Sequence, residues 1–188
     1  MRYFPKRPSE PLLAGFSGKV AVDFRAQNGR IRVMMTDRIL QAAEGYGELG
    51  MFDEALAELD SLPPKQQTEL RVAQARMFLL LQFKQFRSAL EVSRQICEDH
   101  PNLPVGFIHT AFCLHELGQT LEAREILIAG PQSLLEEATY YYNLACYNAV
   151  LGEMQQARAY LKTSFKMNKK FRELAEHDPD LSAIWQEV

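Results

Sequence analysis

The sequence predicts an all-α protein built from about four helical hairpins, because small residues recur in it at a fixed interval of 34. An alanine column consists of Ala55, Ala89, Ala123 and Ala157. Five residues earlier stands a turn column of Gly50, Lys84, Gly118 and Gly152. Twelve residues before the alanines stands a third column of Ala43, Met77, Ala111 and Ala145. A period of 34 is typical of solenoids whose repeat is a pair of packed helices.

The composition is that of an ordinary globular protein, and the charge is unevenly distributed. The chain has 188 residues, of which 47% are hydrophobic and 24% charged, and its formal net charge is −3. Residues 1–35 carry +5 and residues 36–188 carry −8, so we place a boundary at residue 35. The balance does not indicate a nucleic-acid or membrane partner. The N-terminus lacks the apolar run of a signal peptide and no stretch resembles a membrane span, which predicts a cytoplasmic protein.

The basic N-terminal segment, residues 1–35, lacks helical periodicity. Three prolines make residues 1–18 irregular, whereas in residues 19–34 apolar residues alternate on both sides of Asn28-Gly29. Asn-Gly between alternating runs is the strongest short signal for a β-hairpin, so we predict a short hairpin here. An irregular lead-in and an additional helix are the alternatives.

From Thr36 onward the apolar period becomes helical. The first repeat turns at Gly50 and ends at Pro63-Pro64, with the next helix expected near Gln66. Three further units are expected over 70–101, 104–130 and 135–168. We predict that residues 172–188 form a helix that caps the end of the solenoid. Asp180 is its expected N-cap and Trp185 its expected apolar anchor.

These columns, together with the Gly50-Met51-Phe52 turn and Pro101, make residues 36–171 resemble the tetratricopeptide repeat family. Lys84, Met77 and Thr120 depart from the family pattern, and its early tryptophan is absent. The resemblance implies a right-handed superhelix of paired helices, a concave surface lined by the first helix of each pair, and binding of proteins or peptides without chemistry.

No motif predicts catalysis, a cofactor or a metal. The segment Gly45–Gly50 is a literal G-x-G-x-x-G, but it closes one helix and precedes another, so a repeat turn explains it better than a nucleotide site. The histidines and the three cysteines lack metal-ligand or nucleophile–base spacing. We therefore predict reduced core thiols, no cofactor and no enzymatic activity.

If the first helices line a concave surface, apolar and aromatic residues gather in its middle. The predicted peptide-binding groove consists of Arg71, Gln74, Phe78, Leu81, Ile108, His109, Phe112, His115, Tyr142 and Asn143. Aromatic anchors in a partly polar groove suit a peptide with apolar side chains. We predict an adaptor for a protein or peptide. The alternatives are a self-associating structural protein, such as a homodimer, whose groove an N-terminal segment fills, and a chaperone-like holder of a secreted protein.

Overall fold

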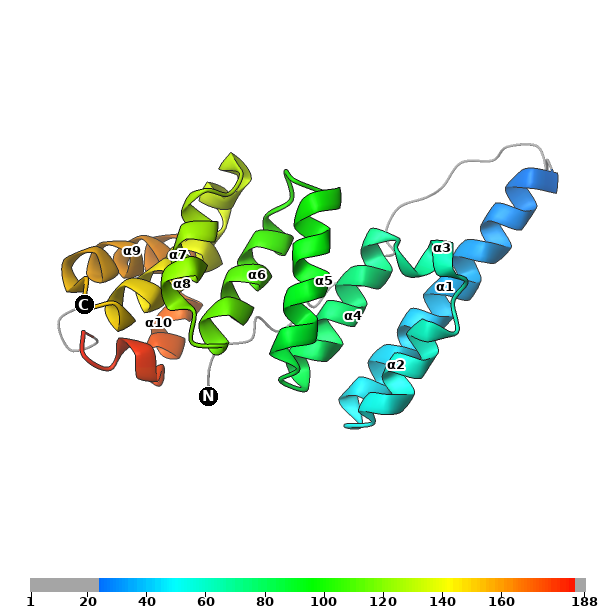
Figure 1. Cartoon of the computed structure of the whole chain (residues 1–188), viewed down its shortest axis with the longest axis horizontal. Coiled ribbons are helices and arrows are strands. Elements are labelled where there is room, and N and C mark those ends of the chain that lie inside the picture. The colour runs from blue at the N-terminus through cyan, green and yellow to red at the C-terminus, as the bar shows by residue number, and fades with distance from the viewer. Residues whose placement is uncertain (1–23, 185–188) are drawn as a thin grey trace. The chain divides into compact units, whose positions relative to one another are not determined.

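The computed structural model describes residues 24–184, which form ten α-helices and two 3₁₀-helices and contain no strand. These residues divide into two compact units, 24–75 and 76–184, and the division falls inside α4 (Leu70–Gln82) (Figure 1). None of the helices in the described range combines the length and the apolar content needed to cross a bilayer.

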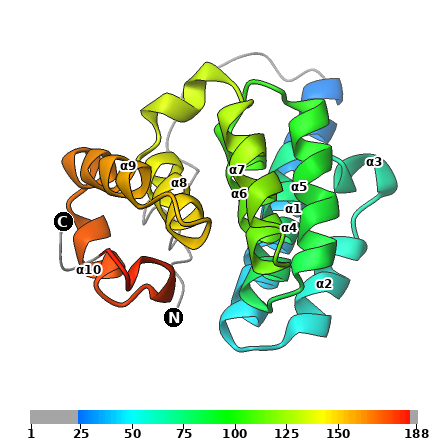
Figure 2. The ribbon, with the colours of Figure 1, turned by 60° about the vertical axis from the view of Figure 1, so that its left-hand side comes forward.

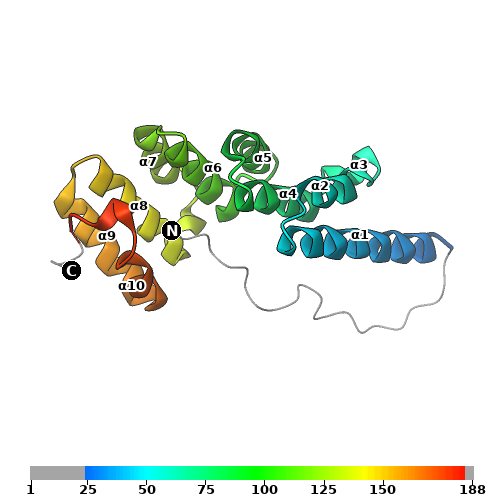
Figure 3. The same cartoon turned by 90° about the horizontal axis from the view of Figure 1, so that it is seen from below.

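The first unit is a helical hairpin followed by a short helix and the start of α4. α1 (Phe24–Glu48) packs against α2 (Phe52–Asp60), as Figures 1 and 3 show. Ala43 and Ala55 are almost fully buried, so the small-residue columns do allow close contact between helices. α3 (Pro64–Gln67) begins with a proline at its first turn, where the missing amide costs nothing. A short helix is thus present near Gln66, where one was expected, and α4 begins at Leu70, the expected start of the second repeat.

The β-hairpin prediction is wrong for its turn and its second strand. Asn28-Gly29 and the alternating residues after it are helical, as part of α1. An isolated hairpin is only marginally stable, whereas these residues extend a helix that is already packed against α2. The additional-helix alternative therefore holds from Phe24 onward. Val20 and Val22 lie outside the described residues, and the boundary proposed at residue 35 falls within α1.

The second unit contains the end of α4 and the remaining helix pairs. α5 (Phe86–Asp99) follows α4, and two further pairs are α6 (Pro104–Glu116) with α7 (Thr120–Ile128) and α8 (Ala138–Val150) with α9 (Met154–Met167) (Figures 1 and 2). Consecutive helices from α5 to α9 contact one another. A 3₁₀-helix, η1 (Gln132–Glu136), precedes α8 and was not predicted. The helix pairs match the expected 34-residue units, whereas the right-handed superhelix stays a prediction.

The columns of the repeat have the predicted structural roles. Every member of the alanine column is 0% exposed. The third column is equally buried, including Met77, which fills the place of a small residue at 0% exposure. The turn column adopts positive φ throughout, at Gly50, Lys84, Gly118 and Gly152.

The described part of the chain ends in a short helix and a 3₁₀ turn, whereas one capping helix was expected over 172–188. α10 (Lys170–Ala175) is followed by η2 (Pro179–Leu181), which contacts α8 (Figure 2). The predicted N-cap is wrong by two residues, because the Asp178 carboxylate accepts the amide of Asp180 at 3.0 Å. Proline favours the first position of a helix, so the turn begins at Pro179 and the residue before it, Asp178, is the N-cap. Trp185 lies outside the described residues.

Candidate functional site

The predicted groove residues are distributed over both units. Arg71 and Gln74 belong to the first unit, and the other eight belong to the second. The guanidinium of Arg71 forms an ion pair with Asp37, which stands 34 residues earlier on α1, and lies 3.6 Å from the Glu69 carboxylate. Arg71 therefore already serves as a link between α1 and α4. We call the members in the second unit the inner face: Phe78, Leu81, Ile108, His109, Phe112, His115, Tyr142 and Asn143.

Two phenylalanines of the inner face are half-buried. The ring of Phe78 on α4 meets the imidazole of His109 on α6 edge to face, with centroids 5.1 Å apart. Phe112 follows His109 by three residues on the same helix and packs edge to face on Phe86 at 6.1 Å. Residues three apart lie on one side of a helix. The structure therefore brings Phe78, His109 and Phe112 to one side of α6.

Three aliphatic or polar members of the inner face are buried. Leu81 is 2% exposed, Ile108 8% and His109 5%. Burial lowers the pKa of His109 to about 4, because the imidazolium would lose its hydration. His109 is therefore neutral near pH 7 and contributes shape rather than charge.

Tyr142 on α8 is not at the surface in this structure. It is 2% exposed, and its ring stacks on Phe171 of α10 at a centroid distance of 4.8 Å. Its hydroxyl donates to Oδ2 of Asp178 at 2.8 Å. Asn143, the next residue, is half-buried. The expectation of an open aromatic surface running through Tyr142 is therefore corrected, because Phe171 and Asp178 cover this ring.

His115 at the end of α6 is also buried and faces the same C-terminal segment. Its Nδ1 lies 3.0 Å from Oγ1 of Thr120, and its Nε2 lies 2.8 Å from Oδ2 of Asp180. The imidazole packs on the ring of Tyr147 at 4.8 Å. Contacts on three sides thus fix its orientation.

The carboxylates of Asp178 and Asp180 lie within hydrogen-bond distance of side chains on α6 and α8. We call these five residues the C-terminal anchor: His115, Tyr142, Cys146, Asp178 and Asp180. The thiol of Cys146 lies 3.7 Å from the Asp178 oxygen that also accepts from Tyr142. Cys146, Asp178 and Asp180 place one potential metal ligand each within 4.8 Å, the one such cluster in residues 24–184. Because each of these groups makes hydrogen bonds inside the anchor, attachment of the C-terminal segment accounts for the cluster without a metal.

The contacts of the two aspartates of the anchor were not predicted, and Asp180 was expected only as an N-cap. The aspartates are 32 to 65 residues away in the sequence from the side chains they contact, so no local sequence pattern predicts these contacts. The sequence signal that could have indicated this site is the spacing of Tyr142 and Cys146. They lie four residues apart on one helix, which places two hydrogen-bond donors on one face.

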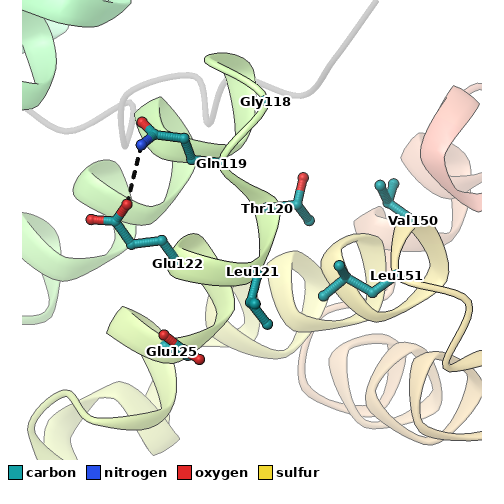
Figure 4. A pocket seen from close by; sticks show the side chains of 8 residues that line it. All are labelled: Gly118, Gln119, Thr120, Leu121, Glu122, Glu125, Val150 and Leu151. Carbon is teal, nitrogen blue, oxygen red and sulfur yellow. Dashed lines mark hydrogen bonds between the residues drawn. The ribbon is translucent and has the colours of Figure 1, made fainter.

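A shallow depression elsewhere on the second unit lies where the turn before α7 meets the end of α8. Figure 4 shows Leu121 and Glu122 entering it from α7 and Val150 from the end of α8. Leu121 and Val150 are about half exposed, at 50% and 48%. Its lining includes Thr120, whose hydroxyl lies 3.0 Å from Nδ1 of His115, and the carboxylates of Glu122 and Glu125.

Comparison with known proteins supports the architecture. No protein-family model matches this sequence, and no curated protein matches it either. Solved structures of tetratricopeptide proteins are similar in fold, and three of them follow. TTC0263, a thermophilic TPR protein from Thermus thermophilus, superposes with a TM-score of 0.63 at 19% identity, covering 74% of this chain and 79% of that one.

Two structures of MamA are similar to about the same degree. MamA residues 41 to the end, from Desulfovibrio magneticus RS-1, gives a TM-score of 0.62 at 16% identity and covers 71% of this chain and 76% of that one. The MamA RS-1 ArsTM double mutant gives 0.61 at 16% identity, with 71% and 75% coverage. Identities this low establish the fold alone. The resemblance found in the sequence is thereby confirmed, and the chain has the tetratricopeptide repeat fold.

Proposed function

We propose that this protein is a non-enzymatic adaptor that binds a segment of a partner protein on the inner face of its second unit. The tetratricopeptide fold generally serves as a scaffold for protein–protein interaction. Phe78 and Phe112 supply half-buried aromatic rings on this face. Rings of this kind, partly packed and partly open, are typical anchors of protein interfaces.

The observation that carries the proposal is that the chain's own C-terminal segment already lies on this face. Asp178 and Asp180 bond to Tyr142 and His115, and Leu181 is 0% exposed. A three-residue turn therefore contributes both hydrogen bonds and a buried apolar side chain to helices far away in the sequence. A partner peptide would be held by the same two kinds of interaction.

Cys97, Cys113 and His109 favour binding over catalysis. Burial raises the pKa of Cys113 to about 12 and also raises that of Cys97, so both thiols stay protonated near pH 7. A thiol nucleophile requires the opposite shift. His109, with its lowered pKa, faces Phe78 rather than a nucleophile.

Several finer points stay predictions. Residues 1–23, which would fill the groove in a self-associating protein, lie outside the described residues. The homodimer and chaperone alternatives and the cytoplasmic location stay predictions.

Site-specific photo-crosslinking tests the proposal. Phe112→p-benzoylphenylalanine places a reactive ketone on the inner face. Phe107→p-benzoylphenylalanine is the matched control, because Phe107 is also half-buried on α6 but lies toward Gly130 at the end of α7. We expect a discrete crosslinked protein from position 112 and none from 107. Equal crosslinking from both positions, or none from 112, would contradict the proposal.

A further inference from the structure

We propose that His115, Tyr142 and Cys146 form a receptor site for an acidic peptide of a partner protein, and that the chain's own Asp178–Leu181 segment occupies it as a competing internal ligand. The recognised pattern is two aspartates separated by one residue and followed directly by an apolar residue. This inference rests on the proposed function and specifies the chemistry of the partner segment.

The first half of the receptor lies on α8 and binds the carboxylate of Asp178. Tyr142 and Cys146 stand four residues apart, so both side chains project from the same face of the helix. The phenol donates to Oδ2 of Asp178 at 2.8 Å, and the thiol lies 3.7 Å from the same oxygen. Burial raises the pKa of Tyr142 far above its ordinary value, so the phenol keeps its proton and acts as a donor.

The second half of the receptor lies on α6 and binds the carboxylate of Asp180. Nε2 of His115 faces Oδ2 of Asp180 at 2.8 Å. The other ring nitrogen faces the Thr120 hydroxyl at 3.0 Å, and Tyr147 packs on the ring. Thr120 and Tyr147 belong to α7 and α8, not to the C-terminal segment. The imidazole is therefore held in place by the receptor itself and would present the same nitrogen to an incoming peptide.

The occupying segment shows which groups a ligand needs. Oδ1 of Asp178 accepts the amide of Asp180 at 3.0 Å, which leaves Oδ2 to the receptor. Leu181 and Ile184 are both 0% exposed. Pro179, Ser182 and Ala183 are exposed, so the site places no evident demand on them. The requirement thus reduces to two carboxylates and apolar side chains, a pattern that other proteins can carry.

Exchange between the internal segment and a partner is energetically plausible because the interactions are replaced one for one. The internal segment is a single 3₁₀ turn, closed by a few short-range bonds such as that from the Leu181 amide to the Asp178 carbonyl at 3.1 Å, and not a long helix. A partner with the same four groups would restore the same hydrogen bonds and burial. It must, however, compete with a tethered ligand whose effective concentration is on the order of millimolar. Weakening the internal ligand should therefore strengthen binding from solution by at least about tenfold.

Fluorescence anisotropy on the full chain tests this expectation. The probe is a labelled peptide with the sequence of residues 176–184, Glu-His-Asp-Pro-Asp-Leu-Ser-Ala-Ile. We expect it to bind the D178N/D180N chain at least about tenfold more tightly than the wild type. Adding Tyr142→Phe to that variant should remove most of the gain. A control peptide with both aspartates changed to asparagine should not bind.

A second variant covers the case in which apolar contacts alone retain the internal segment. D178N/D180N with Leu181→Ser removes those contacts too, and circular dichroism shows whether each chain keeps its helices. Failure of the acidic peptide to bind either folded variant overturns the proposal. So does equal binding of the acidic and asparagine peptides. A light-scattering mass showing a wild-type dimer that D178N/D180N dissociates would assign the segment to a second copy and overturn it as well.

The inference and the proposed function fail in different ways. If the peptide does not bind but position 112 still crosslinks a partner, the acidic-peptide receptor is wrong and the adaptor function stands. If the peptide binds and no partner crosslinks at position 112, the receptor stands and the Phe112-centred interface is wrong.

Discussion

Lys84 adopts the left-handed backbone conformation that Gly118 adopts at the same phase of the next repeat. The φ angles are 57° and 82°. In both turns the amide of this residue donates to the carbonyl three residues earlier, at 3.0 and 2.9 Å, and the next amide donates to the carbonyl five residues before it, at 2.8 Å. This is the Schellman pattern that ends a helix. The turn is therefore kept even where a side chain makes its conformation costly.

Lys84→Gly should stabilise the protein. A non-glycine residue in the left-handed region costs roughly 1–2 kcal/mol, part of which the greater freedom of glycine in the unfolded chain offsets. We expect a net gain of about 1 kcal/mol in the free energy of unfolding, which corresponds to a rise in Tm of about 2–4 °C. Thermal melts followed by circular dichroism measure it.

Ser88→Gly is the control for that substitution, because Ser88 is exposed within α5 and has ordinary helical geometry. Glycine inside a helix costs about 0.5–1 kcal/mol, so this variant should melt earlier than the wild type. If both glycine variants melt earlier, Lys84 carries no strain.

Ala157→Leu should be clearly more destabilising than Ala159→Leu. The two alanines lie two residues apart on α9, and the first is 0% exposed whereas the second is exposed. A larger side chain in a close helix contact forces its neighbours apart and costs about 1–3 kcal/mol. Urea unfolding of the two variants measures the difference, and equal midpoints would refute the close contact.

His109 should make the protein less stable as the pH falls below about 6.5. Burial lowers the pKa of His109 to about 4 in the folded chain, against 6.5 as its ordinary value, so between these values the unfolded chain binds the extra proton. The stabilisation by the neutral ring is complete above pH 6.5 and lost as the pH falls toward 4. The difference at pH 4 should amount to at most about 3 kcal/mol.

His109→Gln removes this titration while retaining a polar side chain. The unfolding free energy of this variant should fall less steeply between pH 6.5 and 4 than that of the wild type, as urea titrations at several pH values would show. Parallel pH curves would mean that His109 is accessible to protons in the folded protein.

The helix pairs and the buried columns could be predicted because packing imposes them at every repeat. A small residue at the alanine phase is required wherever two helices approach closely, and the requirement recurs four times. Asn28-Gly29 misled the prediction because a local turn signal is weaker than the continuation of a packed helix. The contacts of Asp178 and Asp180 could not be predicted, because they depend on where a non-repeated segment folds back onto α6 and α8.

Phe112→Ala should weaken capture of the partner much more than Phe107→Ala. Both rings are half-buried on α6, so both truncations remove a comparable amount of packing. Phe112 belongs to the inner face, beside His109, whereas Phe107 lies against the end of α7 near Gly130. Truncating a central aromatic anchor costs about 2–4 kcal/mol of binding, a loss of tens-fold or more in affinity.

The measurement is the amount of co-purified partner at equal concentrations of each variant, with the Tm of each determined in parallel. Similar Tm values for the two variants, together with loss of capture in Phe112→Ala alone, would locate binding on the inner face. If Phe112→Ala unfolds the chain while Phe107→Ala does not, the Phe112 ring is a core residue that supports Phe86. If both variants fold and capture the partner as the wild type does, binding takes place elsewhere, and self-association through the N-terminal segment becomes the better hypothesis.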